Sequence, residues 1–292
     1  MAAAEGFGRA LRLLAGLGFA VLLAACGGGD EDSGEDTTPV PVPVPTPTPT
    51  PTPTVYPAPN GPVATDRVIR QDYGGYQLTY DCTTHTALQY SYTLGFDDGT
   101  VARPTSFKLD PTLPEGCGQQ TTANSYAAAI HPGYDRGHLV SSNHMDYNAD
   151  YILRANYMTN IVPQVATFNR NVWLDAENVA ECYRDIAPVQ VYGGVVYSDP
   201  SNDWFLASHG IRTPEYFWKA ILTTDPDTGA AKAIAWYIPN VEGLTALDPY
   251  LVSIDELERL VGTGLVGITA PAAVKAMKPA TSWPLPAGCN YT

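Results

Sequence analysis

Basic residues are scarce in this 292-residue chain: 16 lysines and arginines stand against 30 aspartates and glutamates, which gives a net charge of −14. Proteins that bind nucleic acid are usually basic, so this composition argues against an extended cationic binding surface. It still allows a local basic patch, or a metal ion that offsets the acidic groups.

Long apolar runs are also missing. The one candidate, residues 13–25, is too short for a comfortable membrane span, and because Arg9 and Arg12 precede it, it is typical of a signal peptide. The run ends in LAAC at Cys26, which resembles the bacterial lipobox. That resemblance implies a lipidated Cys26 and anchoring at a membrane surface. Gly27 then favours an outer-membrane lipoprotein of the cell envelope, facing the periplasm or the outside. The alternative is an ordinary signal peptide with a chance cysteine.

The chain divides by composition into three parts. Residues 1–25 are the expected signal peptide. Residues 26–58 pass from acidic and glycine-rich sequence into a Pro-Thr and Pro-Val repeat, which cannot bury a core and favours a disordered, extended spacer. Residues 59–292 are long enough for one domain with a substantial core. The domain retains 14 basic and 24 acidic residues, a net charge of −10.

Closely spaced cysteines are absent, so a zinc site is not expected. After Cys26, four cysteines remain: Cys82, Cys117, Cys182 and Cys289. An even number in an exported chain suggests two disulfides, and three pairings are open. We favour Cys82 with Cys117, because they are close in the chain, and Cys182 with Cys289, as a staple for the C-terminus.

Residue patterns in the domain predict a mixed α+β fold with strands dominant. Tyrosine-rich stretches and buried apolar runs predict strands at 75–82, 87–96 and 189–197, and a hairpin over 216–239. The Gly193-Gly194 pair suggests a bulge within the third of these strands. Helical spacing predicts helices over 171–185 and 253–262, and the second begins with a capping box.

His138 is one of only five histidines, and it stands directly after Asp135, Arg136 and Gly137. A lone histidine is most often structural, but these neighbours favour chemistry on a phosphate. A neutral imidazole can take a proton from water near neutral pH. The planar guanidinium of Arg136 suits a phosphate. Gly137 allows a tight turn or close approach to a ligand. Asp135 could fix a loop or orient a ring nitrogen.

A second constellation consists of Asn169, Trp173 and Glu177, which are spaced by four and would stack along one side of a helix. An amide oxygen is an acceptable ligand for magnesium, which takes few protein ligands and keeps several waters. A carboxylate two turns away could hold one of those waters. The alternative is an ordinary capped helix with an exposed glutamate.

The two segments together resemble the DNA/RNA non-specific endonucleases, which have a ββα-metal core. The family pattern is Asp-Arg-Gly-His, then Asn-x-x-Pro-Gln, here at residues 160–164, and then the helix that bears Asn169 and Glu177. Residues 100–114 also resemble the family's arginine-bearing strand, with Arg103 four residues before Phe107. The chain departs from the pattern at 140–141, where Val-Ser follows the histidine and leucine, and at 171, where asparagine replaces glycine. Neither departure falls on a residue assigned to chemistry.

The resemblance implies an α+β fold in which a β-hairpin and a helix are embedded in a larger, mostly antiparallel sheet flanked by helices. It implies Mg²⁺-dependent cleavage of DNA and RNA to 5′-phosphate ends, with Mn²⁺ as another usable ion. The roles it implies are His138 as general base, Asn169 as the direct metal ligand, Glu177 as orienting a metal-bound water, Arg103 and Arg136 as charge stabilisers with Lys108 as the rival of Arg103, and Asp135 as loop support.

Two other functions stay open on the sequence. The acidic charge suggests a catalytically weak or inactive binding module of the same fold, and the site could also serve a phosphodiesterase acting on another phosphoester. Among the other histidines, we expect His144 to be a loop or core residue, with a substrate contact as the alternative. His85, His131 and His209 receive no functional role.

Overall fold

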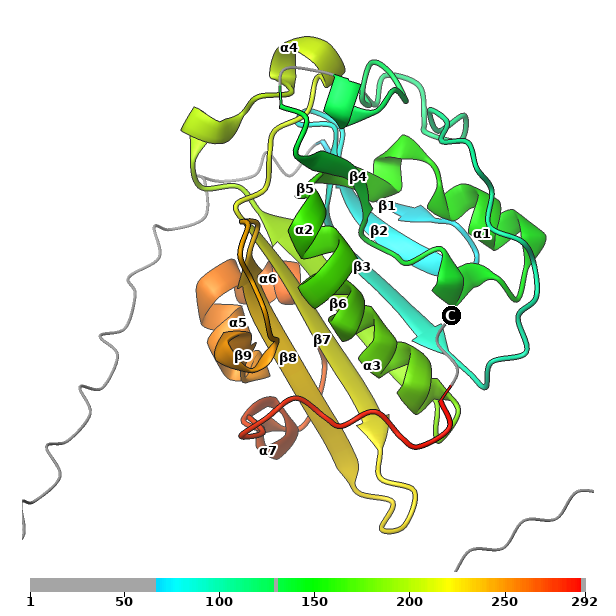
Figure 1. The fold of residues 1–292 in the computed structure, drawn as a ribbon, viewed down its shortest axis with the longest axis vertical. Helices are drawn as coiled ribbons and strands as arrows, with labels where there is room; N and C mark the ends of the chain where they lie inside the picture. The colour runs from blue at the N-terminus through cyan, green and yellow to red at the C-terminus, as the bar shows by residue number, and fades with distance from the viewer. Residues whose placement is uncertain (1–66, 129–130, 290–292) are drawn as a thin grey trace, which may run out of the picture. The chain divides into compact units, whose positions relative to one another are not determined.

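The structure is a computed structural model that describes residues 67–128 and 131–289 (Figure 1). These residues belong to the unit Thr54–Thr292. The expected signal peptide at 1–25, the linker at 26–58 and Cys26 lie outside the described residues. Within the described residues, no helix is long and apolar enough to cross a membrane.

The described residues form two sheets, of which the larger is antiparallel and has the strand order β1-β2-β3-β6-β7-β8-β9. Its strands are β1 (Val68–Asp72), β2 (Tyr76–Asp81), β3 (Thr86–Leu94), β6 (Val189–Val196), β7 (Tyr216–Thr224), β8 (Ala231–Pro239) and β9 (Leu251–Val252). The strands and the hairpin predicted from the sequence are confirmed. Alternation of apolar residues selects the core face of each strand, as in β2, where Tyr76, Leu78 and Tyr80 are buried.

The expected bulge at Gly193-Gly194 is wrong, because β6 keeps regular register with both neighbours through these residues. The glycines make room for large side chains instead. A Cβ at Gly193 would lie 2.1 Å from the Tyr90 hydroxyl, and one at Gly194 would lie 2.3 Å from the Leu88 carbonyl oxygen and 2.8 Å from the Trp218 indole nitrogen. The register shift of the sheet lies between Thr79 and Tyr80.

Helices cover both faces of the large sheet (Figure 1). On β7, Phe217 and Ile221 pack with α3 on one face, while Trp218 and Ala220 pack with α5 on the other. The helix predicted over 253–262 is α5, and its capping box is present. The α-helices are α1 (Ala149–Ala155), α2 (Ala166–Phe168), α3 (Leu174–Arg184), α4 (Leu206–His209), α5 (Ile254–Val261), α6 (Thr263–Val266) and α7 (Ala272–Lys275).

The second sheet is an antiparallel pair, β4 (Tyr134–His138) and β5 (Ile161–Val165). Strand β5 runs directly into α2, then a π-helical turn at Asn169–Trp173, then α3. Two strands followed by a helix make up a ββα unit beside the large antiparallel sheet, so the predicted fold class is confirmed. The expected strand around Arg103 is wrong. That segment is a loop, with a single bridge from Lys108 to Tyr157, because it carries a proline and no alternating apolar pattern.

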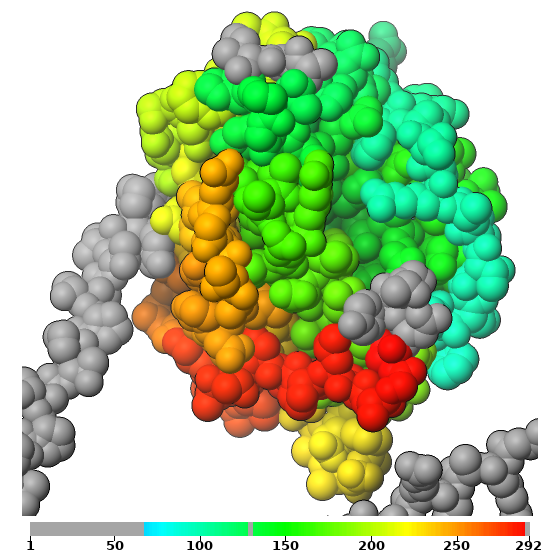
Figure 2. Space-filling view, in the orientation of Figure 1, coloured from blue at the N-terminus to red at the C-terminus, as the bar shows by residue number. Residues whose placement is uncertain are grey.

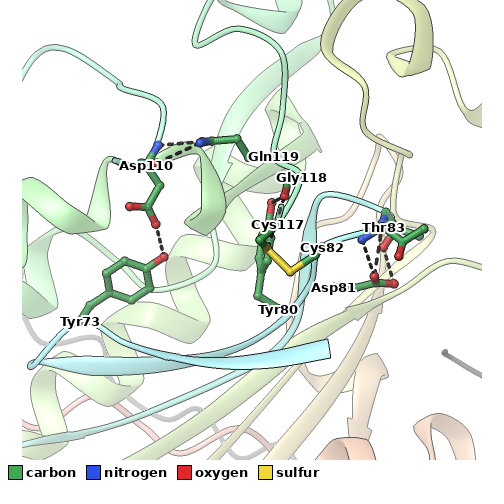
Figure 3. The surroundings of a disulfide bond; sticks show 10 residues. Tyr73, Tyr80, Asp81, Cys82, Thr83, Asp110, Cys117, Gly118 and Gln119 are labelled. Carbon is green, nitrogen blue, oxygen red and sulfur yellow. Dashed lines mark hydrogen bonds between the residues drawn. A yellow bond between two sulfur atoms is a disulfide. The ribbon is translucent and has the colours of Figure 1, made fainter. Parts of the chain in front are cut away.

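Two disulfides fasten the loops and the C-terminus, in the pairing favoured from the sequence. Cys82–Cys117 holds the long loop after β3 against β2 (Figure 3), where Tyr73 also donates a hydrogen bond to Asp110. Cys182–Cys289 joins α3 to the C-terminal segment. Figure 2 shows that segment, in red, lying across one face of the domain.

Candidate active site

A cavity of about 230 Å³ opens between the β4–β5 pair and the helical segment that follows it. It is lined by five of the six residues that the sequence singled out for chemistry: Arg103, Arg136, His138, Asn169 and Glu177. The sixth, Asp135, hydrogen-bonds to Asn169. Lys108, the rival of Arg103, does not line this cavity. The cavity therefore joins groups from a loop, a strand and a helix.

His138 is the last residue of β4 and is 8% exposed. Strand β4 holds its backbone in register with Ile161 of β5. Gly137 leaves room for the side chain of Gln164 on β5, since a Cβ there would lie 2.2 Å from Gln164 Oε1 and 2.4 Å from Gln164 Cβ. The tight turn considered for this glycine is absent, because Gly137 lies within a regular ladder.

The hydrogen bonds of His138 fix its tautomer. The amide nitrogen of Asn156 donates to the carbonyl oxygens of Pro104 and Ser106, at 2.9 and 3.3 Å, so its Oδ1 must face the imidazole. That oxygen can only accept, and it lies 2.8 Å from His138 Nε2. The ring therefore carries its proton on Nε2 and keeps the lone pair on Nδ1.

The lone pair of His138 faces positive charge. A guanidinium nitrogen of Arg103 lies 3.4 Å from Nδ1. Burial lowers the pKa of His138 to about 3, and the charge of Arg103 acts in the same direction, while the hydrogen bond to Asn156 opposes it. The imidazole is therefore neutral across the physiological range, which is the form that can accept a proton.

Arg136 is held in place by two contacts. Its guanidinium donates to the carbonyl of Ala123 at 2.8 Å and lies over the Phe107 ring, 3.9 Å from the centroid. Phe107 also contacts His138, with ring centroids 5.4 Å apart. Arg136 and Arg103 thus place two cationic forks on the wall that contains the imidazole, a suitable arrangement for a phosphate.

Asp135 orients the amide of Asn169 and does not contact the imidazole. Its Oδ2 accepts from Asn169 Nδ2 at 3.0 Å, and both of its oxygens accept from Arg170. Because a carboxylate oxygen only accepts here, the nitrogen of Asn169 must face Asp135, which leaves Asn169 Oδ1 free. An amide oxygen held in this way is a suitable ligand for a hard divalent ion.

The helix that carries Asn169 does not have the regular four-residue spacing expected of it. The π-helical turn at Asn169–Trp173 changes the helical register, and π turns are often found at functional sites. Trp173 is consequently 1% exposed and packs against Phe168 and Phe217. Leu174, which is 43% exposed, lines the cavity at the position expected for Trp173.

Glu177 lies between the cavity and the sheet. Its Oε1 is 3.9 Å from the Nζ of Lys219, which is fully buried on β7. Burial raises the pKa of Glu177, and the charges of Lys219 and Arg103 act in the opposite direction. The expected exposed glutamate of an ordinary capped helix is not what the structure shows, since this side chain is 13% exposed.

Sequence reasoning missed two contacts of the imidazole and the lysine beneath the helix. Asn156 lies 18 residues after His138, and nothing in its neighbours distinguishes it from other asparagines. Ser142 Oγ donates to Asn156 Oδ1 at 3.0 Å and lies 3.2 Å from His138 Nε2. A signal for Lys219 was present, because it interrupts the apolar face of a buried strand.

His144 is a core residue, as expected from the sequence. It is 1% exposed, its Nδ1 lies 2.7 Å from the Tyr92 hydroxyl, and its Nε2 lies 3.3 Å from Glu181. It also lines a second cavity of about 250 Å³ that shares Arg103 and Glu177 with the first.

A neutral imidazole with its lone pair on Nδ1, two guanidiniums and an open amide oxygen, gathered at a ββα unit, define the class of ββα-metal nucleases. Comparisons with known proteins agree. The family model described as DNA/RNA non-specific endonuclease matches residues 58–276. The chain belongs to this family, and it is an endonuclease that hydrolyses phosphodiester bonds.

Named relatives are also nucleases. A protein named "Nuclease" from Nostoc sp. is 28% identical over 208 residues, which cover 67% of this chain and 72% of that protein. The mitochondrial nuclease of Saccharomyces cerevisiae is 28% identical over 189 residues, covering 59% of this chain and 56% of the yeast protein. In a crystal structure of the EndoG/EndoGI complex, a chain at 20% identity superimposes with a TM-score of 0.53, covering 66% of this chain and 83% of that one. The last similarity shows the fold alone.

Proposed function

We propose that this protein is a Mg²⁺-dependent endonuclease that cleaves both DNA and RNA and leaves 5′-phosphate ends. The observation that carries the proposal is the neutral His138, with its lone pair on Nδ1, in one cavity with two arginines and the free amide oxygen of Asn169. The family description and the nuclease relatives support the substrate class.

In this proposal His138 is the general base and takes a proton from the attacking water at Nδ1, while Asn156 holds the opposite ring nitrogen. Arg103 and Arg136 stabilise the negative charge that builds on the phosphate. Contacts restricted to phosphate and sugar would explain why both nucleic acids are accepted, because such contacts carry no sequence information.

The residues present fit a divalent ion with few protein ligands. Within residues 67–128 and 131–289, no three His, Cys, Asp or Glu side chains form a group that could hold a metal. Asn169 Oδ1 would bind Mg²⁺ directly, and Glu177 would hold it through water, with Mn²⁺ as an alternative ion. When bound, the ion supplies Lewis-acid stabilisation of the phosphate and the leaving oxygen. Asp135 would keep the amide of Asn169 in the ligating orientation.

Cleavage assays on the purified full-length chain test this function. Supercoiled plasmid and a structureless RNA should both be degraded with Mg²⁺ and remain intact with EDTA, and His138→Ala should lose at least about 10²–10³ in rate. Degradation of a small phosphodiester alone, with both nucleic acids left intact, would replace this proposal with a phosphodiesterase of another substrate class.

We further propose that Cys26 is lipidated and holds the domain at the cell envelope, as an outer-membrane lipoprotein that faces the periplasm or the outside. The support is the LAAC sequence after a short apolar run and the Pro-Thr spacer behind it. Metabolic labelling with a radioactive fatty acid should mark the chain, and Cys26→Ser should abolish the label. A labelled Cys26→Ser chain would contradict this assignment.

A further inference from the structure

Three buried donor groups lie around one carboxylate, that of Glu177. They are the Lys219 ammonium and the Tyr90 hydroxyl, which have no hydrogen-bond partner among the described residues, and the Trp173 indole N–H, which interacts with the carboxylate itself. Lys219 Nζ lies 3.9 Å from Glu177 Oε1 and 4.2 Å from the centre of the Trp173 ring. Burial raises the pKa of Tyr90, and the nearby charge of Glu177 acts in the same direction.

Sheet packing alone does not explain a lysine at position 219. Phe217 and Ile221 precede and follow it on the same face of β7, and both belong to the apolar core. An ammonium group that is 0% exposed loses its hydration, which destabilises the folded state. A buried donor left without a partner adds a further desolvation cost. An apolar residue at 219 would avoid both terms.

The surroundings of Lys219 are specifically shaped to hold it. Gly193 of β6 lies between Tyr90 of β3 and Lys219 of β7 in the register of the three strands. The Tyr90 ring occupies the place where a side chain at 193 would lie, since a Cβ there would be 2.1 Å from the Tyr90 hydroxyl. Glycine at this position therefore brings a hydroxyl and an ammonium together beneath α3.

Lys219 is also the one cation in ion-pair contact with Glu177 among the described residues. Its contact is to Oε1, and the indole N–H of Trp173 interacts with the same carboxylate. Glu177 lines both the candidate active-site cavity and the cavity beside it. Lys219 and Trp173 thus restrict the orientation of this carboxylate from the side of the sheet.

We propose that Lys219 is a positioning residue, which anchors Glu177 from beneath and, together with Trp173, holds the carboxylate at the wall of the active-site cavity. This inference rests on the proposed function, in which Glu177 holds the metal ion through water. Lys219 itself does not touch substrate. Trp173 supports the ammonium through its ring face, a cation–π contact that is stronger when desolvated.

A double-mutant cycle tests the inference with Lys219→Met, Glu177→Gln and the double variant, all in the full chain. Groups that orient a metal site typically contribute 10–100-fold in affinity or activity. Lys219→Met should therefore lower kcat on plasmid DNA about 10–100-fold with little change in KM. It should also weaken Mn²⁺ binding, measured by electron paramagnetic resonance without nucleic acid, by about tenfold. In the Glu177→Gln background, Lys219→Met should change neither quantity further.

Lys232→Met is the matched control. Lys232 lies on β8, over the rings of Tyr183 and Trp283 at 4.5 and 4.4 Å, so its removal also deletes a lysine–aromatic contact of this domain. It does not line either cavity, and its variant should keep kcat and Mn²⁺ affinity. A loss in Lys232→Met equal to that in Lys219→Met would show that the effect is general to the core.

Equal losses from Lys219→Met in the wild-type and Glu177→Gln backgrounds would overturn the inference, because the lysine would then act independently of the carboxylate. Should Lys219→Met alone not fold, Glu177→Gln and the double variant still decide. Equal kcat and Mn²⁺ affinity in these two support the inference, and a further tenfold loss in the double variant overturns it. Inactivity of the unsubstituted chain would instead contradict the proposed function, and the Mn²⁺ measurement would still test Lys219.

Discussion

Acidification should destabilise this domain in part through a single side chain, His138. Its pKa lies at about 3 in the folded protein, against an ordinary value of 6.5, chiefly because burial disfavours the charged ring. The unfolded chain therefore binds a proton below about pH 6.5 that the folded chain refuses until about pH 3. Stability is complete above the unfolded value and is lost as the pH falls towards the folded value.

The magnitude follows from this shift. One proton bound only in the unfolded state changes the free energy of unfolding by about 1.36 kcal/mol per pH unit. Between about pH 7.5 and about pH 4.5, His138 should thus remove roughly 2.7 kcal/mol of stability. Solvent screening reduces this figure little, because the side chain is 8% exposed.

Urea unfolding at several pH values measures the effect, with His138→Gln as the control. Burial also lowers the pKa of His144, and that contribution is present in both proteins, so it cancels in the difference. The free energy of unfolding of the wild type, measured relative to that of the variant, should fall by about 2.7 kcal/mol across this interval. Parallel curves for the two proteins would refute the assignment of a buried, neutral His138.

Three further outcomes are expected. Asn156→Leu removes the acceptor that fixes the tautomer of His138, and kcat on plasmid DNA should fall about 10²-fold. Hydrolase variants with the wrong histidine tautomer lose more than this, and an unchanged kcat would contradict the assigned tautomer. Asp135→Ala releases the amide of Asn169, and the Mg²⁺ concentration for half-maximal activity should rise about 10–100-fold, with unchanged Mg²⁺ dependence as the contrary result. Added NaCl should inhibit plasmid cleavage at fixed Mg²⁺, because the acidic domain has few cations to hold the strand, and activity independent of salt would exclude this account.

Several elements were predictable because their signals are local. The capping box of α5 lies within four consecutive residues, and alternating tyrosines identify β2 and β3. The ββα unit was predicted through the family resemblance, which the order of the Asp-Arg-Gly-His, Pro-Gln and asparagine-bearing segments carries. The disulfide pairing followed from chain proximity and from the position of Cys289 at the end of the chain.

Other features failed because their causes are not local. Gly193 suggested a bulge in the sequence, but glycine is needed there because the ring of Tyr90 on the neighbouring strand leaves no room for a side chain. Arg103 was expected on a strand, yet it reaches the imidazole from a loop. The four-residue spacing of Asn169, Trp173 and Glu177 predicted one helical stripe, and the π turn instead directs Trp173 into the core.

The sequence by itself determined which chemical groups this protein has for its reaction, because the histidine, the arginines and the asparagine stand in short ordered motifs. The tertiary structure alone decided their states. Asn156 sets the proton of the imidazole, Asp135 turns the amide of Asn169, and Lys219 lies beneath Glu177. Protonation and side-chain orientation depend on burial and on partners distant in the chain, and these come together only when the sheet and the helix pack.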